Sequence, residues 1–198
     1  DFKKIVGAEV VEIASLPPCV PGMRLNNKLV ATAKNERVDY VLGSKVTGCT
    51  VADGKVVSVT VGTAGAGKEI KADAVVLAGG GFESGALKLD SHGHLHETIL
   101  DLPVTMPEGV KEEDLIHGDY WGSPQPLFLC GVEVDETMLV TYQGKPVHSN
   151  VYAAGGVIAG ATRWQEKSGE GIALGSAIKA ADAILSSVGA GAATKERN

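Results

Sequence analysis

Two short apolar runs, each ending in glycines, constrain the fold more than any other feature of this 198-residue chain. Residues 74–78 read AVVLA and lead into glycines at 79–81, and residues 151–154 read VYAA and lead into glycines at 155–156. A continuous apolar run of this length is typical of a strand buried on both faces of a layered sheet. Glycine at the end of such a strand lets backbone N–H groups approach a bound group with no side chain in between. The pattern predicts an α/β fold with two glycine-tipped strands.

The strongest helix pattern follows the second glycine turn, over residues 169–188. Its apolar face is predicted to pack on the core and consists of Ile178, Ala181, Ile184, Leu185 and Val188. A helix N-terminus offers free N–H donors and the positive end of the helix dipole, which would favour the negative N1–C2=O edge of a reduced flavin. Ordinary helix capping is the alternative. The predicted cofactor contacts are Ala78, Gly79, Gly80, Gly81, Gly155, Gly156, Val157, Gly169, Glu170, Gly171 and Ile172.

The remaining pattern is that of a mixed domain. A helix is predicted over Val20 to Asn35, where Pro21 occupies a tolerated first-turn position. The predicted strands are Tyr40 to Leu42, Lys45 to Thr50, Lys55 to Val61 and a short one around Ile70, with a hairpin turn at Asp53-Gly54. Residues 84–141 carry a weaker pattern typical of an insertion or cap. The polar tail at 189–198 is predicted to fray.

Composition excludes several classes of function. The net charge of −6 argues against nucleic acid as the main partner, because phosphate binding needs a basic face. The sequence has no apolar stretch of the roughly 18 residues that span a bilayer, so we expect no direct membrane span. The three cysteines form no CxxC motif, which argues against an iron–sulfur or structural zinc site in this chain and favours a reduced, cytoplasmic compartment.

Two motifs have plainer explanations. Residues 62–68 match the glycine and lysine spacing of a phosphate-binding loop, but Glu69 stands where a hydroxyl is needed and a strand follows instead of a helix, so a hairpin loop is favoured. The alternating histidines His92, His94 and His96 could chelate zinc or copper if they shared a strand face. A solvated loop is the favoured interpretation, and no metal site is predicted.

Longer segments of the chain resemble a known family. The order of a β-meander, "ADAVVLAGGGFESG", a cap, "NVYAAGGVIAG" and "SGEGIALGSAIKAADAIL" resembles flavoproteins of the two-dinucleotide-binding type, which include the fumarate reductase and succinate dehydrogenase flavoprotein subunits. The segments "VPGMRLNNKL", "ETILDLPV", "PQP" and "GVEVDET" are similar to the family of B subunits of anaerobic glycerol-3-phosphate dehydrogenases. The resemblance runs from about residue 17 to residue 188.

This resemblance implies a cofactor, a reaction and partners. The cofactor would be FAD, with FMN as the alternative. The reaction would be oxidation of sn-glycerol 3-phosphate to dihydroxyacetone phosphate. Electrons would pass through a catalytic flavoprotein partner subunit and an iron–sulfur membrane-anchor subunit to quinone. The chain would lie in the cytoplasm or at the inner face of the cell membrane.

The chain departs from the family pattern in two places. The sequence has no strand–GxGxxG–helix opening for the ADP half of FAD, so it resembles the C-terminal half of the family, and the fragment alone is expected to be inactive. Residues 163–168 read RWQEKS where the family pattern has a glycine- and cysteine-rich segment. Three parts are predicted: residues 1–83 and 148–198 as two parts of the flavin-binding fold, and residues 84–147 as a cap.

The candidate catalytic residues are His148, His117 and Arg163. Removal of the hydroxyl proton needs a base with a pKa near the working pH, which points to histidine. Arg163 follows the second glycine turn and could bind a phosphate with its planar guanidinium. Two further functions stay open: a related flavoprotein that acts on another small substrate, and a non-catalytic assembly or electron-transfer subunit.

Overall fold

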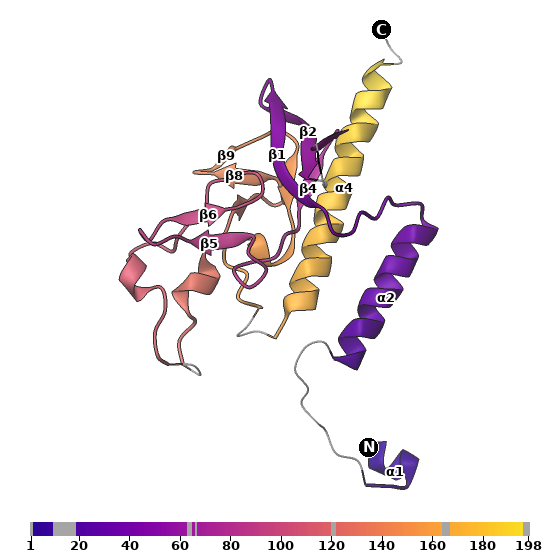
Figure 1. The fold of residues 1–198 in the computed structure, drawn as a ribbon, viewed down its shortest axis with the longest axis vertical. Helices are drawn as coiled ribbons and strands as arrows, with labels where there is room; N and C mark the ends of the chain where they lie inside the picture. The colour runs from indigo at the N-terminus through magenta and orange to yellow at the C-terminus, as the bar shows by residue number, and fades with distance from the viewer. Residues whose placement is uncertain are drawn as a thin grey trace. The chain divides into compact units, whose positions relative to one another are not determined.

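The computed structural model describes residues 2–9, 19–62, 65, 67–119, 122–163 and 167–195 (Figure 1). The chain divides into two compact units, residues 1–44 and residues 45–198. This division does not coincide with the boundaries predicted at residues 83 and 147. All of the glycine turns that the sequence singles out lie in the second unit.

The first unit contains α1 (Phe2–Val6) and α2 (Val20–Asn35). The predicted bounds of α2 are confirmed. Cys19 caps this helix, because its Sγ accepts a hydrogen bond from the Gly22 N–H at 3.4 Å. The strand predicted over Tyr40 to Leu42 is wrong: these described residues form no strand, and their side chains are exposed, so no core packing supports one there.

The second unit begins with an antiparallel sheet in chain order, formed by β1 (Lys45–Ala52), β2 (Lys55–Gly62) and β3 (Lys68–Lys71). The hairpin turn predicted at Asp53-Gly54 is confirmed. Asp53 has φ +51° and Gly54 has φ +72°, and these positive values at both central residues are those of a type I′ turn. Residues 63, 64 and 66 of the predicted loop lie outside the described residues.

The two glycine-tipped strands pair in parallel. β4 (Val75–Leu77) lies beside β10 (Val151–Ala153), with Val75 opposite Val151 and Leu77 opposite Ala153. Burial on both faces is confirmed for β10, whose three residues are all buried. It is wrong for β4, where Val76 is 41% exposed. Val75 and Leu77, which alternate with Val76 along the strand, are partly or fully buried, so only one face of β4 packs into the core.

Residues 84–147 form short elements that contribute to the core. The core cluster takes Leu87, Leu100, Leu102, Val132 and Val140 from this segment. The segment is therefore built into the domain and does not only cover it. Its elements are β5 (Leu87–Leu89), β6 (Leu95–Glu97), η1 (Glu112–Asp114), η2 (Pro126–Leu129), β7 (Glu133–Val134), β8 (Val140–Tyr142) and β9 (Lys145–Pro146).

Two buried polar side chains hold these parts together. Asn150, directly before β10, accepts a hydrogen bond from Val56 N–H at 2.9 Å and donates to the carbonyls of Val56 and Asp73 at 2.8 and 2.9 Å. Asn150 thus joins the first sheet to the parallel strands. The Glu97 carboxylate, 2% exposed, accepts hydrogen bonds from the N–H groups of Leu100 at 2.8 Å and Leu102 at 3.3 Å and so fixes the loop after β6.

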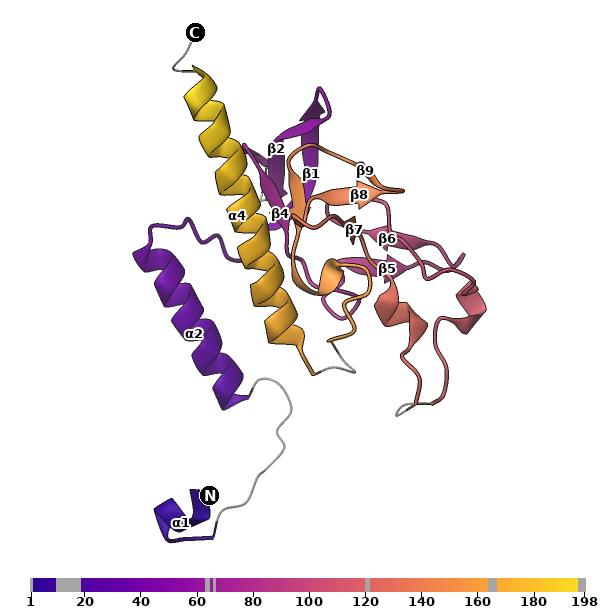
Figure 2. The same cartoon turned by 180° about the vertical axis from the view of Figure 1, so that it is seen from behind.

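The last helix, α4 (Gly169–Lys195), runs alongside the sheets in both views (Figures 1 and 2). Its predicted buried face is wrong, since Ile178, Leu185 and Val188 are each more than half exposed. Ser176 and Ala180 are buried instead, because small residues let the helix backbone approach β10 and the turn after it closely. The helix continues to Lys195, into the tail predicted to fray, and residues 196–198 lie outside the described residues.

By length and composition alone, Gly169–Val188 of α4 could cross a membrane. This is weak evidence, because the core helices of folded domains satisfy the same test.

Asn150→Ala is expected to lower the free energy of unfolding of the second unit by roughly 2–4 kcal/mol, because it leaves the buried N–H and carbonyl of Val56 and the part-buried carbonyl of Asp73 without partners. Urea unfolding followed by circular dichroism measures this change. Asn27→Ala, at an exposed position of α2, is the control and should leave the second unit unchanged within about 0.5 kcal/mol. A loss below about 0.5 kcal/mol for Asn150→Ala would contradict its role in joining the sheets.

Candidate functional site

The parallel pairing of β4 and β10 brings both glycine turns to the same end of the sheet. The Ala154 N–H donates to the Leu77 carbonyl at 2.9 Å, so the ladder continues to the point where the turns begin. A Cβ atom on Gly81 would lie only 3.0 Å from the Gly156 carbonyl oxygen. The two turns, far apart in sequence, therefore lie against each other.

Arg163 crosses both turns. Its Nη1 donates to the Gly156 carbonyl at 3.0 Å, and its Nη2 forms an ion pair with the Glu83 carboxylate. Side chains at the glycines would collide with it: a Cβ on Gly156 would lie 2.7 Å from Cζ of Arg163, and a Cβ on Gly81 would lie 2.7 Å from Nη2. The absence of side chains at Gly81 and Gly156 is thus what allows the guanidinium to lie between the turns.

The second turn continues as η3 (Gly155–Val157) and is bonded to α4. Ser176 Oγ accepts a hydrogen bond from the Gly155 N–H at 2.9 Å and donates to the Ile172 carbonyl at 2.5 Å. Gly155 has φ +75°, a left-handed conformation that favours glycine. The glycine turn and the first turns of α4 are therefore held as one piece.

An open cavity of about 550 Å³ adjoins this arrangement and is lined by Glu83, Phe128, Arg163, Lys167, Gly169 and Glu170. This volume is within the range of small-molecule sites. Of the predicted site residues, Arg163, Gly169 and Glu170 line this cavity. Sequence reasoning missed Glu83, Phe128 and Lys167. Pro126 at the start of η2 was the available signal for a short ordered turn carrying Phe128.

The first glycine turn is filled by the chain's own atoms. Ser84 Oγ donates to the carbonyls of Gly79 at 2.6 Å and Gly81 at 3.0 Å. A Cβ on Gly79 would lie 2.6 Å from Ile99 Cδ1. Gly79 and Gly80 therefore serve local packing, and Gly81 is the member of this turn that faces Arg163. Ala78 lines a separate cavity of about 380 Å³ together with the residues of β4.

Neither candidate histidine is among the described residues that line the cavity beside Arg163. The backbone N–H of His117 donates to Gln125 Oε1 at 2.9 Å, and its ring Nδ1 contacts Gln125 Nε2 at 3.2 Å. His148 precedes β10, at the opposite end of this strand from Gly155, and its buried Nδ1 has no hydrogen-bond partner within the described part of the chain. Their role as a base therefore stays a prediction.

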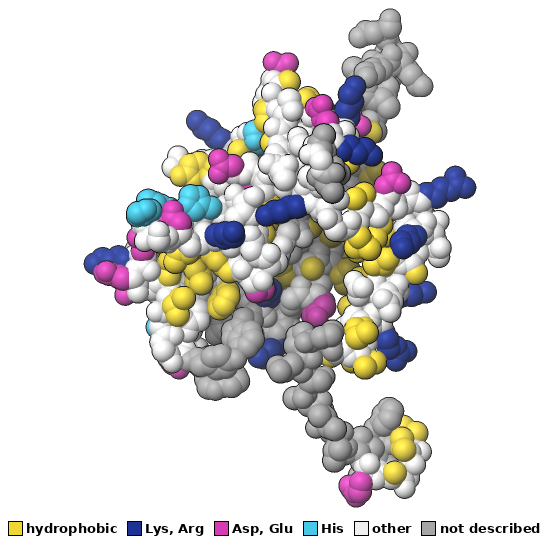
Figure 3. Space-filling view, in the orientation of Figure 1, with side chains coloured by type: hydrophobic (Ala, Val, Ile, Leu, Met, Phe, Trp, Pro, Cys, Tyr) yellow, Lys and Arg dark blue, Asp and Glu magenta, His cyan; other side chains and the backbone are white. Residues whose placement is uncertain are grey.

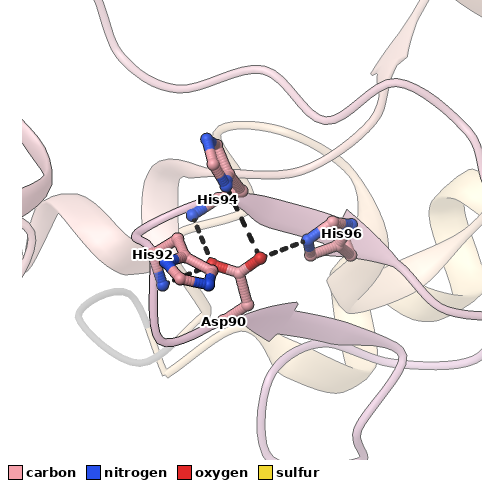
Figure 4. A network of polar contacts seen from close by, with 4 residues as sticks. All are labelled: Asp90, His92, His94 and His96. Carbon is pink, nitrogen blue, oxygen red and sulfur yellow. Dashed lines mark hydrogen bonds and ion pairs between the residues drawn. The ribbon is translucent and has the colours of Figure 1, made fainter.

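The three-histidine motif surrounds a carboxylate in an exposed turn between β5 and β6 (Figure 4). Asp90 accepts hydrogen bonds from the backbone N–H groups of His92 and His94 at 2.8 and 2.9 Å and lies 3.0 Å from Nε2 of His96. The hydrogen bond with His96, followed by that from the His94 N–H, lowers the pKa of Asp90 well below its usual range. Figure 3 shows histidines at one edge of the surface. No group of three potential ligands suited to a metal ion occurs within the described ranges.

Cys130 is buried, and burial raises the pKa of its thiol to about 11. Its Sγ lies 3.5 Å from the Pro126 carbonyl. A thiol that stays protonated in this way is a poor nucleophile and a poor metal ligand. Cys130 is therefore a packing residue near η2.

Comparison with known proteins gives a match to the family described as "FAD binding domain", over residues 2–172. A probable B subunit of an anaerobic glycerol-3-phosphate dehydrogenase from Halobacterium salinarum is 28% identical over 186 residues, covering 92% of this chain and 42% of the relative. The B subunit of the anaerobic glycerol-3-phosphate dehydrogenase of Glaesserella parasuis is 27% identical over 188 residues, covering 93% and 43%. The chain thus spans less than half the length of these relatives. No solved structure matches.

Ser176→Ala is expected to destabilise the second unit by about 1–3 kcal/mol, because the buried Gly155 N–H loses its acceptor. Ser186→Ala is the matched control, since Ser186 makes the same bond to the carbonyl four residues earlier, at 2.8 Å, but on an exposed surface. Chemical denaturation and hydrogen exchange at the Gly155 amide measure both variants. Equal losses of unfolding free energy in the two variants would show that the hydrogen bond between the glycine turn and α4 does not stabilise the second unit.

Proposed function

This chain belongs to the FAD-binding domain family. On that premise we propose that it is part of the flavin-binding domain of a dehydrogenase that oxidises sn-glycerol 3-phosphate to dihydroxyacetone phosphate. The observation that carries the proposal is the open cavity that Arg163 and Gly169 line, with Arg163 held between Gly81 and Gly156. The names of the relatives supply the substrate class.

The residues present fit the flavin part of such a cofactor. Arg163 occupies the space over Gly81 and Gly156, so a flavin would bind in the adjoining cavity that Arg163 lines. Phe128 supplies an apolar wall, and α4 begins at Gly169 on the cavity's lining. A flat ring with a negative edge is the kind of group that such surroundings bind. The proposed cofactor is FAD, with FMN as the alternative because both carry the same ring.

A bound flavin would supply the hydride acceptor. The chain's own residues would bind and orient the substrate. Arg163 is proposed to hold the phosphate, because its planar guanidinium can make two parallel hydrogen bonds to phosphate oxygens. His117 and His148 remain the proposed bases for the hydroxyl proton.

The proposed complex contains further subunits, since the relatives are named as B subunits. We propose a catalytic flavoprotein partner and an iron–sulfur subunit that anchors the complex at the inner face of the cell membrane and passes electrons to quinone. A second candidate is a flavin-binding electron-transfer subunit without substrate turnover. This candidate is favoured by the placement of both histidines away from the described lining of the cavity.

Gly155→Val is expected to weaken FAD binding about tenfold or more, because a branched side chain is strained at φ +75° and displaces the second glycine turn. FAD fluorescence quenching during titration of the full chain measures the affinity. Gly54→Val is the control, since Gly54 has a similar φ of +72° in the β1–β2 hairpin, away from the cavity. Unchanged FAD affinity in Gly155→Val would contradict the placement of the flavin at this turn.

Arg163→Gln is expected to raise the KM for sn-glycerol 3-phosphate by about tenfold or more in the assembled dehydrogenase, because a hydrogen bond to a charged group contributes roughly 1.5–3 kcal/mol. Dye-linked oxidation of the substrate provides the measurement. Arg24→Gln, on the exposed surface of α2, is the matched control. No oxidation by the wild-type complex, together with retained FAD binding, would favour the electron-transfer candidate.

A further inference from the structure

We propose that Glu83 is a displaceable counter-ion, which holds the anion-binding side of Arg163 until a phosphate-bearing ligand takes its place. The proposal rests on the proposed function for the identity of the ligand, but not for the chemistry of the ion pair. It assigns Glu83 the role of a residue that sets the affinity of the cavity for anions.

Arg163 is the fixed member of the pair. Its side chain is only 22% exposed, and its Nη1 is held by the Gly156 carbonyl at 3.0 Å. The glycines at 81 and 156 enclose the guanidinium so closely that added Cβ atoms would collide with it. It is also the only arginine in the sequence between residues 38 and 196. A planar group fixed in this way keeps its orientation when its counter-ion leaves.

Glu83 is the loosely held member. Its side chain is 61% exposed, so the carboxylate can turn into water without a desolvation penalty. Ion pairs with such an exposed partner contribute about 0–1 kcal/mol to stability. Glu83 also lies on the turn after β4 that lines the cavity, where an incoming ligand meets it. Breaking the pair therefore takes little free energy.

The cavity favours exchange of this carboxylate for a phosphate. Lys167 lines the same space and adds a second positive side chain, while Glu170 is the other carboxylate on the lining. A phosphate monoester carries up to two negative charges and offers three acceptor oxygens, against one charge and two oxygens for a carboxylate. Arg163 thus gains charge-assisted hydrogen bonds when a phosphate replaces Glu83.

Calorimetric titration of the full chain with inorganic phosphate tests the exchange. Glu83→Gln should tighten phosphate binding about three- to fivefold, the gain expected from removing an exposed competing ion pair. Arg163→Gln should weaken it about tenfold. In the double variant the gain from Glu83→Gln should vanish, since Glu83 acts through Arg163. Glu136→Gln, an exposed site in the β7–β8 turn with the same change of charge, should leave the affinity unchanged.

Three results would overturn the proposal. The first is weaker phosphate binding in Glu83→Gln, and the second is an equal gain in affinity from Glu83→Gln in the Arg163→Gln background. The third is no phosphate binding in either the wild type or Glu83→Gln. Thermal unfolding by circular dichroism checks that each variant is folded. The second result would mean a general effect of cavity charge. The first would mean that Glu83 positions Arg163 for the ligand instead of competing with it.

Paired ligands identify the source of the phosphate. If Glu83→Gln tightens the binding of FMN but not of riboflavin, the phosphate beside Arg163 is that of the flavin. If it tightens the binding of sn-glycerol 3-phosphate but not of glycerol, the phosphate is that of the substrate. Either gain supports the exchange. Failure of FAD to bind, with the phosphate results as expected, overturns the proposed function and leaves this inference standing. FAD binding with no effect of Glu83→Gln on the affinity for phosphate overturns this inference and leaves the proposed function standing.

Discussion

The parallel register of β4 with β10 is the constraint on which the candidate site depends. Val75 lies opposite Val151, and the ladder continues to the bond from Ala154 N–H to the Leu77 carbonyl. Because parallel strands end at the same edge, the turn after each strand must lie beside the other. Asn150 fixes the start of β10 through its bonds to Val56 and Asp73. One buried amide at the beginning of the strand therefore helps to position the glycines at its end.

Local patterns in the sequence predicted much of the backbone. The first-turn proline Pro21 marks α2, and the Asp53-Gly54 pair marks the hairpin, because each signal acts within a few residues. The glycine turns could be placed because an apolar run stops abruptly at each. The exposure of Val76 could not be predicted, since it depends on which strands and helices are present to cover β4.

The cavity was only partly predictable for the same reason. Arg163 stands out in the sequence by its place after a glycine turn, but its partner Glu83 is eighty residues away along the chain and carries no motif. The burial of Ser176 and Ala180 instead of the larger apolar residues of α4 follows from the close approach of helix and strand. Hydrophobic periodicity favours the face with the largest side chains, whereas close packing here selects the smallest.

The site joins opposite charges to apolar surface. Two positive side chains, Arg163 and Lys167, and two carboxylates, Glu83 and Glu170, line a cavity to which Phe128 also contributes. Such a mixed lining suits a ligand with a flat apolar body and a charged end, which describes a flavin and, in its charged end, a small phosphate ester.

The apolar residues that α4 turns outward have a consequence for the behaviour of the protein in solution. Leu174, Ile178 and Leu185 are 57, 60 and 69% exposed along one helix. The net charge of −6 keeps molecules apart at low ionic strength, but added salt shortens the range of this repulsion while the attraction between apolar ridges stays. Solubility should therefore fall as salt is added, and dilute buffers should preserve single molecules best.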